Sequence, residues 1–344
     1  MIQKLNYSAA EFKIMKKYIL LIMVLCLAMV AKAQNEVTTA TLQHGDEVSV
    51  FTGVNALVNA HEAAANGDVI TLSAGNFAPI TMTKSVSIYG AGFEKDETAG
   101  TNVTRITGQF GLGNGLTNAH IEGLYLADRI LASTDNDVSD IVIAKCYIAS
   151  NGICFNKAFK NVTLSNDVVI GSVYTNYGAL ATNLVINNCY IENDVSSFSA
   201  ESTVLVDHCI IAGNGGPFTF KNTIFSGGIV GVDANAVAYN CLAFNYRGLN
   251  STTNKTDCYL LQYNAEIKIF EDSPNTGMYG SGKYSPERTF ELTQPETWVG
   301  TDGTEIGIRG GAGWSKLPST PVVKSLQLNV EGKTLKVNYD AEVR

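Results

Sequence analysis

Acidic side chains are the first candidates for chemistry in this chain. Asp135, Asp137 and Asp140 lie close together, and Arg129 and Lys145 are the nearest bases. Calcium binds several oxygen ligands at once, and a polysaccharide lyase combines such carboxylates with an Arg or Lys base. The acidic residues here fall mostly in expected turns and do not line up from one repeat to the next. Solvated turn charges are therefore the favoured interpretation, and calcium is expected as a cofactor only if the protein is a lyase.

Regularly spaced tyrosines are the second candidates. Tyr125, Tyr147 and Tyr190 occupy the same position of a short recurring phrase. A tyrosine combines a flat apolar ring with a polar hydroxyl, which suits stacking against a sugar ring. These three residues form the candidate glycan-binding site.

Four cysteines recur beside these tyrosines, at Cys146, Cys189, Cys209 and Cys241. Neighbouring coils about 4.8 Å apart would permit a Cys189–Cys209 disulfide, but parallel side chains favour a ladder of buried thiols. Cysteine and histidine spacing typical of structural zinc is absent from the sequence.

Composition excludes some classes of function. The chain of 344 residues has a net charge of −8 and 16% charged residues. Nucleic acid is not expected as a partner because phosphate binding needs clustered Lys and Arg. The low charge and 45% hydrophobic residues favour a packed domain over a disordered chain.

The first 33 residues are typical of a secretory signal peptide, with Met15 as an alternative start. Lys16 and Lys17 precede an apolar run, and Ala31-Lys32-Ala33 offers small residues for cleavage. The mature chain would carry 19 basic and 31 acidic residues, a net charge of −12. We expect it to be secreted, periplasmic or on the outer surface, without a membrane-spanning segment.

The elements that position these residues follow from internal repeats. The phrase recurs with reference positions at 124, 146, 167, 189, 209, 223 and 241, at steps typical of one β-solenoid coil with one shortened turn. The residue before each reference tolerates left-handed backbone in all copies but Lys145. This bend column comprises Gly123, Lys145, Asn166, Asn188, His208, Asn222 and Asn240.

The residue after each reference is expected to point outward, yet it is always apolar or aromatic. An exposed apolar row of this kind marks an interface. Three interpretations are open: another segment such as the C-terminal hairpin covers the row, another protein chain covers it, or its tyrosines stack on sugars. The apolar column comprises Tyr125, Tyr147, Val168, Tyr190, Ile210, Ile224 and Leu242.

The N-terminal part of the mature chain carries a resemblance. A helix is expected over 54–65, followed by Asn66-Gly67-Asp68, the strand 69–72 and the motif 86–92. This order resembles the opening of right-handed parallel β-helix proteins of the pectate-lyase-like superfamily, in which the helix caps the first coil. The resemblance implies the fold and keeps a lyase or hydrolase open only by analogy.

The C-terminal stretch predicts a β-hairpin, with strands over 325–330 and 334–339 around Glu331-Gly332-Lys333. The ending is similar to the tails of secreted β-helix proteins of gut Bacteroidota.

The expected architecture is therefore an all-β, right-handed parallel β-helix. Its parts are a signal peptide over 1–33, an N-terminal segment with the capping helix over 34–66, the solenoid over 67–315 and a β appendage over 316–344. The favoured function is non-catalytic binding of a polysaccharide or a cell-surface protein. The alternatives are a polysaccharide lyase or glycoside hydrolase acting on an acidic polysaccharide, and a structural adhesin-like module.

Overall fold

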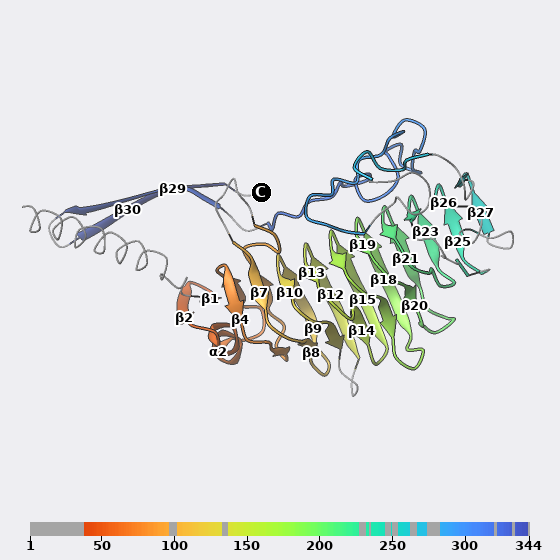
Figure 1. Ribbon diagram of the computed structural model, residues 1–344. Coiled ribbons are helices and arrows are strands. Elements are labelled where there is room, and N and C mark those ends of the chain that lie inside the picture. The colour runs from red at the N-terminus through yellow and green to blue at the C-terminus, as the bar shows by residue number, and fades with distance from the viewer. Residues whose placement is uncertain are drawn as a thin grey trace, which may run out of the picture. The chain divides into compact units, whose positions relative to one another are not determined.

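The computed structural model shows a parallel β-solenoid with one short helix, which confirms the predicted fold class (Figure 1). It describes residues 38–95, 102–132, 137–226, 232–233, 235–244, 249, 254–261, 267–273, 283–319, 322–331 and 334–342. The predicted signal peptide lies outside these residues. Among the described residues no helix is long and apolar enough to cross a membrane.

Three sheets run along the solenoid, because each coil contributes one strand to each sheet for most of its length. Within the described residues they hold 12, 10 and 6 strands. Sheet 1 comprises, in order, β2 (Glu47–Thr52), β1 (Thr39–His44), β3 (Val69–Leu72), β6 (Ser87–Tyr89), β9 (Thr117–Glu122), β12 (Val138–Ala144), β15 (Phe159–Ser165), β18 (Ala181–Asn187), β21 (Val204–Asp207), β23 (Thr219–Lys221), β25 (Val237–Tyr239) and β27 (Asn254–Thr256).

The other two sheets are parallel throughout. Sheet 2 comprises β28 (Tyr259–Leu261), β26 (Leu242–Phe244), β24 (Ile224–Phe225), β22 (Ile210–Ile211), β19 (Tyr190–Ile191), β16 (Val168–Val169), β13 (Tyr147–Ile148), β10 (Tyr125–Leu126), β7 (Thr104–Ile106) and β4 (Gly75–Phe77). Sheet 3 comprises β20 (Val195–Ser196), β17 (Val173–Thr175), β14 (Ile153–Phe155), β11 (Ile130–Ala132), β8 (Phe110–Leu112) and β5 (Thr81–Met82).

The N-terminal end of the solenoid is closed by the helix α2 (Ala56–Ala63) and the antiparallel pair β1–β2. The helix is shorter than the expected 54–65, and it packs Ala56, Leu57 and Ala60 into the core. The β1–β2 pair was not expected from the sequence. Strand β1 pairs antiparallel with β3, the first strand of the coils.

The bend column is confirmed as a line of left-handed residues. Gly123 has φ 73°, and the six non-glycine members have φ between 47° and 59°. Even Lys145, the one residue type that does not suit this geometry, has φ 50°. One conformation therefore recurs in each coil that carries the bend column, whatever residue occupies it.

The ladder of buried thiols is also confirmed. Cys146, Cys189, Cys209 and Cys241 are free and fully buried, and Cys209 Sγ accepts a hydrogen bond from the Cys189 amide at 3.4 Å. Asp167 takes the equivalent place in its coil. Its carboxylate accepts bonds from the amides of Cys146 and Ser165, and burial raises its pKa well above the ordinary value.

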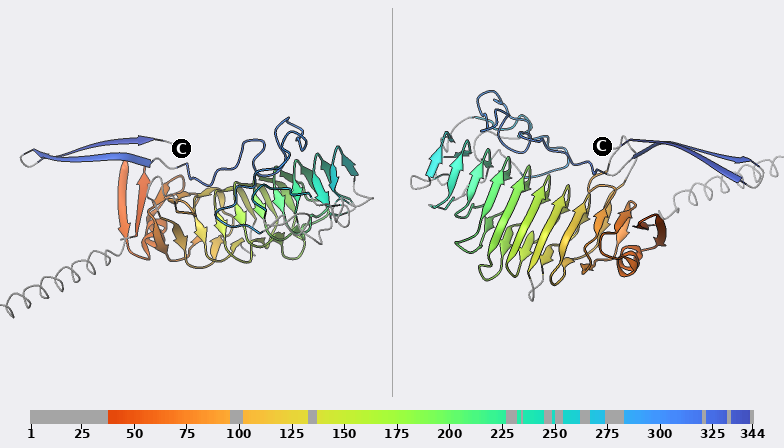
Figure 2. Two further views of the ribbon diagram at one scale, coloured as in Figure 1. Left: turned by 45° about the horizontal axis from the view of Figure 1, so that its top comes forward. Right: turned by 180° about the vertical axis from the view of Figure 1, so that it is seen from behind.

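After the last coil strand, the chain returns along the outside of the solenoid. We name the described residues 283–319 the strap; Figure 2 shows it, in blue, beside the coils from both viewpoints. Beyond it, β29 (Val322–Glu331) and β30 (Thr334–Glu342) form the predicted hairpin. Among the described residues, the last strand of the coils ends at Leu261, and the predicted boundary of the solenoid at 315 stays a prediction.

We expect Asn188→Ala to lower the free energy of unfolding by about 3 kcal/mol. Alanine in the left-handed conformation costs about 1–2 kcal/mol. The substitution also leaves the carbonyls of Ile308 and Gly310 without the Asn188 donor. Asn188→Gly keeps the backbone freedom and should cost roughly 1 kcal/mol less. Urea unfolding followed by circular dichroism measures both; equal losses would show that the left-handed geometry carries no cost.

Candidate functional site

The apolar column lies in line on the outer side of sheet 2, as the strand register requires. Tyr125 is opposite Tyr147, Val168 opposite Tyr190, and Ile210 opposite Ile224. From Val168 onward the column is buried in a second hydrophobic cluster, separate from the core inside the coils. The residues that cover it are Ile269, Phe270, Phe290, Leu292, Trp298, Ile306 and Ile308.

Of the three interpretations left open for this column, coverage by another segment of the same chain is the one observed from Val168 onward. The segments that cover it are residues 267–273 and the strap. The side chains of the C-terminal hairpin, named as the example, lie outside those that the structure describes. The sequence signal was the apolar content of the strap, with Phe290, Trp298, Ile306 and Ile308.

Tyr190 has no exposed surface, so it cannot offer its ring to a sugar. Its ring stacks on Phe290 with centroids 5.5 Å apart, and its hydroxyl accepts a bond from the Tyr284 amide at 3.1 Å. Burial and the nearby Glu192 raise the pKa of Tyr190 to about 12. The expected site of three exposed tyrosines is therefore corrected, because the strap covers Tyr190.

Tyr125 and Tyr147 remain half-buried, and their ring faces already have partners. The two rings stack with centroids 4.9 Å apart, and the guanidinium of Arg105 lies 4.4 Å from the Tyr125 ring centroid. Phe93 stacks on Tyr147 at 6.1 Å. The edges of these rings are what a ligand would meet, and sugar binding by Tyr125 and Tyr147 stays a prediction.

The bend column binds the strap through its side chains, coil after coil. Asn188 Nδ2 donates to the carbonyl oxygens of Ile308 and Gly310 at 2.8 Å each. Asn222 Oδ1 accepts from the Thr301 amide at 2.7 Å. The same pattern recurs for Lys145 with Ser319, Asn166 with Ser315, and Asn240 with Val299.

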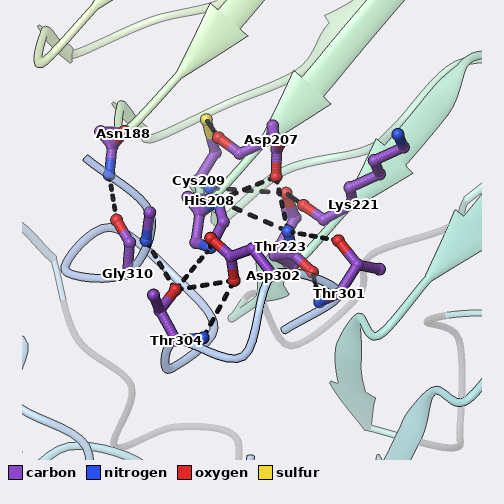
Figure 3. Close-up of polar contacts among 12 residues, drawn as sticks. Asn188, Asp207, His208, Cys209, Lys221, Thr223, Thr301, Asp302, Thr304 and Gly310 are labelled. Atoms are coloured by element: carbon purple, nitrogen blue, oxygen red, sulfur yellow. Dashed lines mark hydrogen bonds and ion pairs between the residues drawn. The ribbon is translucent and has the colours of Figure 1, made fainter. Parts of the chain in front are cut away.

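His208 belongs to the same line of contacts between the bend column and the strap, as Figure 3 shows. Its Nδ1 lies 2.9 Å from Asp207 Oδ1, and its Nε2 lies 3.2 Å from Thr304 Oγ1 and 3.5 Å from Asp302 Oδ2. Thr304 Oγ1 also accepts a bond from the Gly311 amide at 2.7 Å. This arrangement joins a coil to the strap, and it resembles a catalytic triad only in its residue types.

Glu122 is a buried acid that lies beside two bases. His120 Nε2 lies 2.9 Å and Lys145 Nζ 3.3 Å from its carboxylate, and the Ser319 amide donates to it at 2.6 Å. Burial raises the pKa of Glu122, but the bonds from His120 and Ser319 and the charge of Lys145 outweigh it and hold the pKa at about 2. The sequence did not single out Glu122, and Lys145 is the bend residue it could not explain.

The acidic turn candidates are only partly within the described residues. Asp135 lies outside them, and Asp137 is exposed. Asp140 belongs to a second line of left-handed residues, with Asn118, Asn161 and Asn183. Its carboxylate accepts bonds from Asn161 at 2.8 Å and Thr117 at 3.2 Å. The described part of the chain holds no group of three or more His, Cys, Asp or Glu side chains placed to bind a metal.

An open groove of about 480 Å³ crosses the outer face of sheet 3. Strand register places Thr81, Gly111, Leu131, Cys154 and Tyr174 in one row across this face. The groove covers the first three and is bordered by polar side chains. Those side chains are Thr83, Gln109, Asn114 and Asn156.

Gly111 keeps the floor of this groove open. A Cβ at Gly111 would lie 2.5 Å from Thr81 Oγ1, so a larger residue would force the two strands or the Thr81 side chain to move. This groove was not predicted from the sequence, because its row mixes Thr, Gly, Leu, Cys and Tyr without a recurring residue type.

The polar rim is held in place by side-chain hydrogen bonds. Arg129 Nε donates to Gln109 Oε1 at 3.0 Å, and Asn176 Nδ2 donates to Asn156 Oδ1 at 2.7 Å. Burial and Cys154 raise the pKa of Tyr174, while the Arg129 guanidinium beside its hydroxyl lowers it. Tyr177, next to Asn176, is 98% exposed and holds a left-handed φ of 63°. Tyr174, Arg129 and four side-chain amides thus lie on or beside the outer face of sheet 3.

No family model, curated protein or solved structure matches the chain.

We expect Glu122→Gln to reduce stability by roughly 2 kcal/mol near neutral pH, since charged hydrogen bonds are lost. The pKa of Glu122 is about 2 in the folded chain against an ordinary 4.5. Its carboxylate therefore adds stability above pH 4.5 that is lost as the pH falls towards 2. Thermal unfolding between pH 2 and pH 4.5 measures how steeply the melting temperature falls with acid. This fall should be shallower in Glu122→Gln than in the wild type, and it should equal that of the wild type in the control Glu62→Gln. If the melting temperature of Glu122→Gln fell with acid as steeply as that of the wild type, the role given to this carboxylate would be contradicted.

Proposed function

We propose that this protein is a secreted, non-catalytic glycan-binding β-helix of the pectate-lyase-like superfamily, of the kind found in gut Bacteroidota. The observation that carries the proposal is the groove on sheet 3, where Leu131 lies in the floor and three side-chain amides form the border. One of these amides, Gln109, is bonded to Arg129. The signal-peptide pattern supports export, and the order of helix, turn and first strands supports the superfamily.

The side chains at the groove match the two faces of a sugar. Leu131 lines the groove, and Tyr174 lies two strands further along the same outward row. Both side chains offer apolar surface to the C–H face of a sugar ring. Gln109 and Asn156 carry both donors and acceptors for hydroxyl groups.

Arg129 narrows the ligand to glycans that carry carboxylates. Its guanidinium presents several donors in a fixed fork that fits a carboxylate, and its bond to Gln109 limits the conformations it must give up on binding. No carboxylate is among the described residues that line the groove. The pair of acids that glycosidic hydrolysis requires is thus not supplied there, which supports binding without cleavage.

We expect binding of an acidic polysaccharide such as polygalacturonate to weaken about tenfold in Tyr174→Ala, a loss typical of one aromatic contact. Arg129→Gln should weaken binding of acidic glycans at least as much and leave neutral glycans nearly unaffected. Affinity gel electrophoresis with acidic and neutral polysaccharides measures both effects.

Tyr125→Ala serves as the matched control, because Tyr125 is a half-buried tyrosine on a different sheet. Retardation lost in Tyr125→Ala and kept in Tyr174→Ala would move the site to sheet 2. Unsaturated products absorbing in the ultraviolet, or new reducing ends, would replace the binding function with a lyase or hydrolase.

A further inference from the structure

Strand β2 is an open edge at the N-terminal end of sheet 1. It pairs with β1 on one side and has no strand on the other among the described residues. Five of its six residues are exposed, and Val48 and Val50 are 62% and 61% exposed. An exposed edge with β-branched residues is a template for pairing with another strand.

The direction of the backbone groups on β2 follows from the hydrogen bonds around it. The Gly53 amide donates to the Thr38 carbonyl at 2.8 Å, while the Thr39 carbonyl accepts from Ser73 on the opposite side at 2.9 Å. Because hydrogen-bonded pairs alternate along an antiparallel ladder, Glu47, Ser49 and Phe51 direct their backbone groups toward β1. Val48, Val50 and Thr52 therefore direct theirs away from the sheet.

We propose that β2 pairs antiparallel with β2 of a second copy of this chain, about a two-fold axis at Ser49. In this register Val48 lies opposite Val50 of the partner, and Val50 opposite Val48. Both are hydrogen-bonded pairs that use the outward backbone groups. The strand is thus complementary to itself, as a two-fold interface requires.

The side chains favour this register over its neighbours. Two Val–Val pairs form on one face, and Glu47 faces Phe51, so no like charges are opposed. An axis at Val48 would instead place each Val50 opposite Asp46. An axis at Val50 would place each Val48 opposite Thr52, leaving a single Val–Val pair.

A cysteine substituted at the axis tests both the pairing and its register. In the dimer, Ser49 faces its own copy in a non-hydrogen-bonded pair with Cα atoms about 4.5 Å apart, within disulfide range. Mild oxidation of the processed full-length protein carrying Ser49→Cys should give a covalent dimer on non-reducing gels. Val48→Cys should not, because it faces a valine. Wild type oxidised in parallel controls for the half-buried Cys258.

Light scattering over a range of protein concentrations tests the same surface without a new thiol. Wild type should shift from monomer to dimer as concentration rises, and Val48→Lys/Val50→Lys should remain monomeric throughout. Val54→Lys is the matched control: Val54 is 55% exposed and lies just outside β2, so its substitution should leave the dimer intact.

Several outcomes would overturn the proposal. These are a monomeric wild type at all concentrations, a dimer that persists in the double lysine variant, or cross-linking that is equal in Ser49→Cys and Val48→Cys. A monomer in which Ser49→Cys is protected from alkylation would assign the edge to another segment of the same chain. Glycan binding at sheet 3 is measured separately, so neither result decides the other.

Discussion

The left-handed backbone at one position of successive coils, from Gly123 onward, is the constraint on which this structure depends. Asparagine is well suited to it, because its short side chain tolerates positive φ and still carries a donor and an acceptor. At Asn188 and Asn222 the backbone turns the coil while the side chain binds the strap. The same residues therefore shape the solenoid and hold the segment that covers it, which links the spacing of the coils to the path of the strap.

Covering sheet 2 determines where a ligand could bind. The strap buries the apolar column from Val168 onward, and it also bonds to Glu122 and His208. Sheet 3 keeps an outer face with a groove, and this face carries both apolar and hydrogen-bonding side chains. Sheet 2 is thus the sheet that the chain covers with its own strap, while the groove of sheet 3 stays open.

The sequence predicted what repeats and missed what does not. The bend column, the outward apolar column and the thiol ladder were all predictable, because the coils impose one conformation at a fixed spacing. The sequence of the strap does not repeat, so its contacts with Asn188 and Glu122 could not be predicted from the sequence. The groove was missed for a related reason: Gly111 contacts Thr81 and Arg129 contacts Gln109, each in an adjacent coil, and the sequence singled out Arg129 only as a base near the acidic turns.

The strap also imposes an order of assembly on a molecule that could otherwise build itself one coil at a time. Stacked repeats touch only adjacent repeats, so the coils can form as the chain emerges. Ser319 bonds to Glu122 across 197 residues, and Val299 bonds to Asn240 across 59. The apolar side of sheet 2 therefore stays exposed to solvent until nearly the whole polypeptide has been synthesised. The N-terminal coils, which are made first, are the last to be covered by the strap. Contacts so distant in sequence are slow to form, which makes the interval before closure the stage at which this chain is most vulnerable to aggregation.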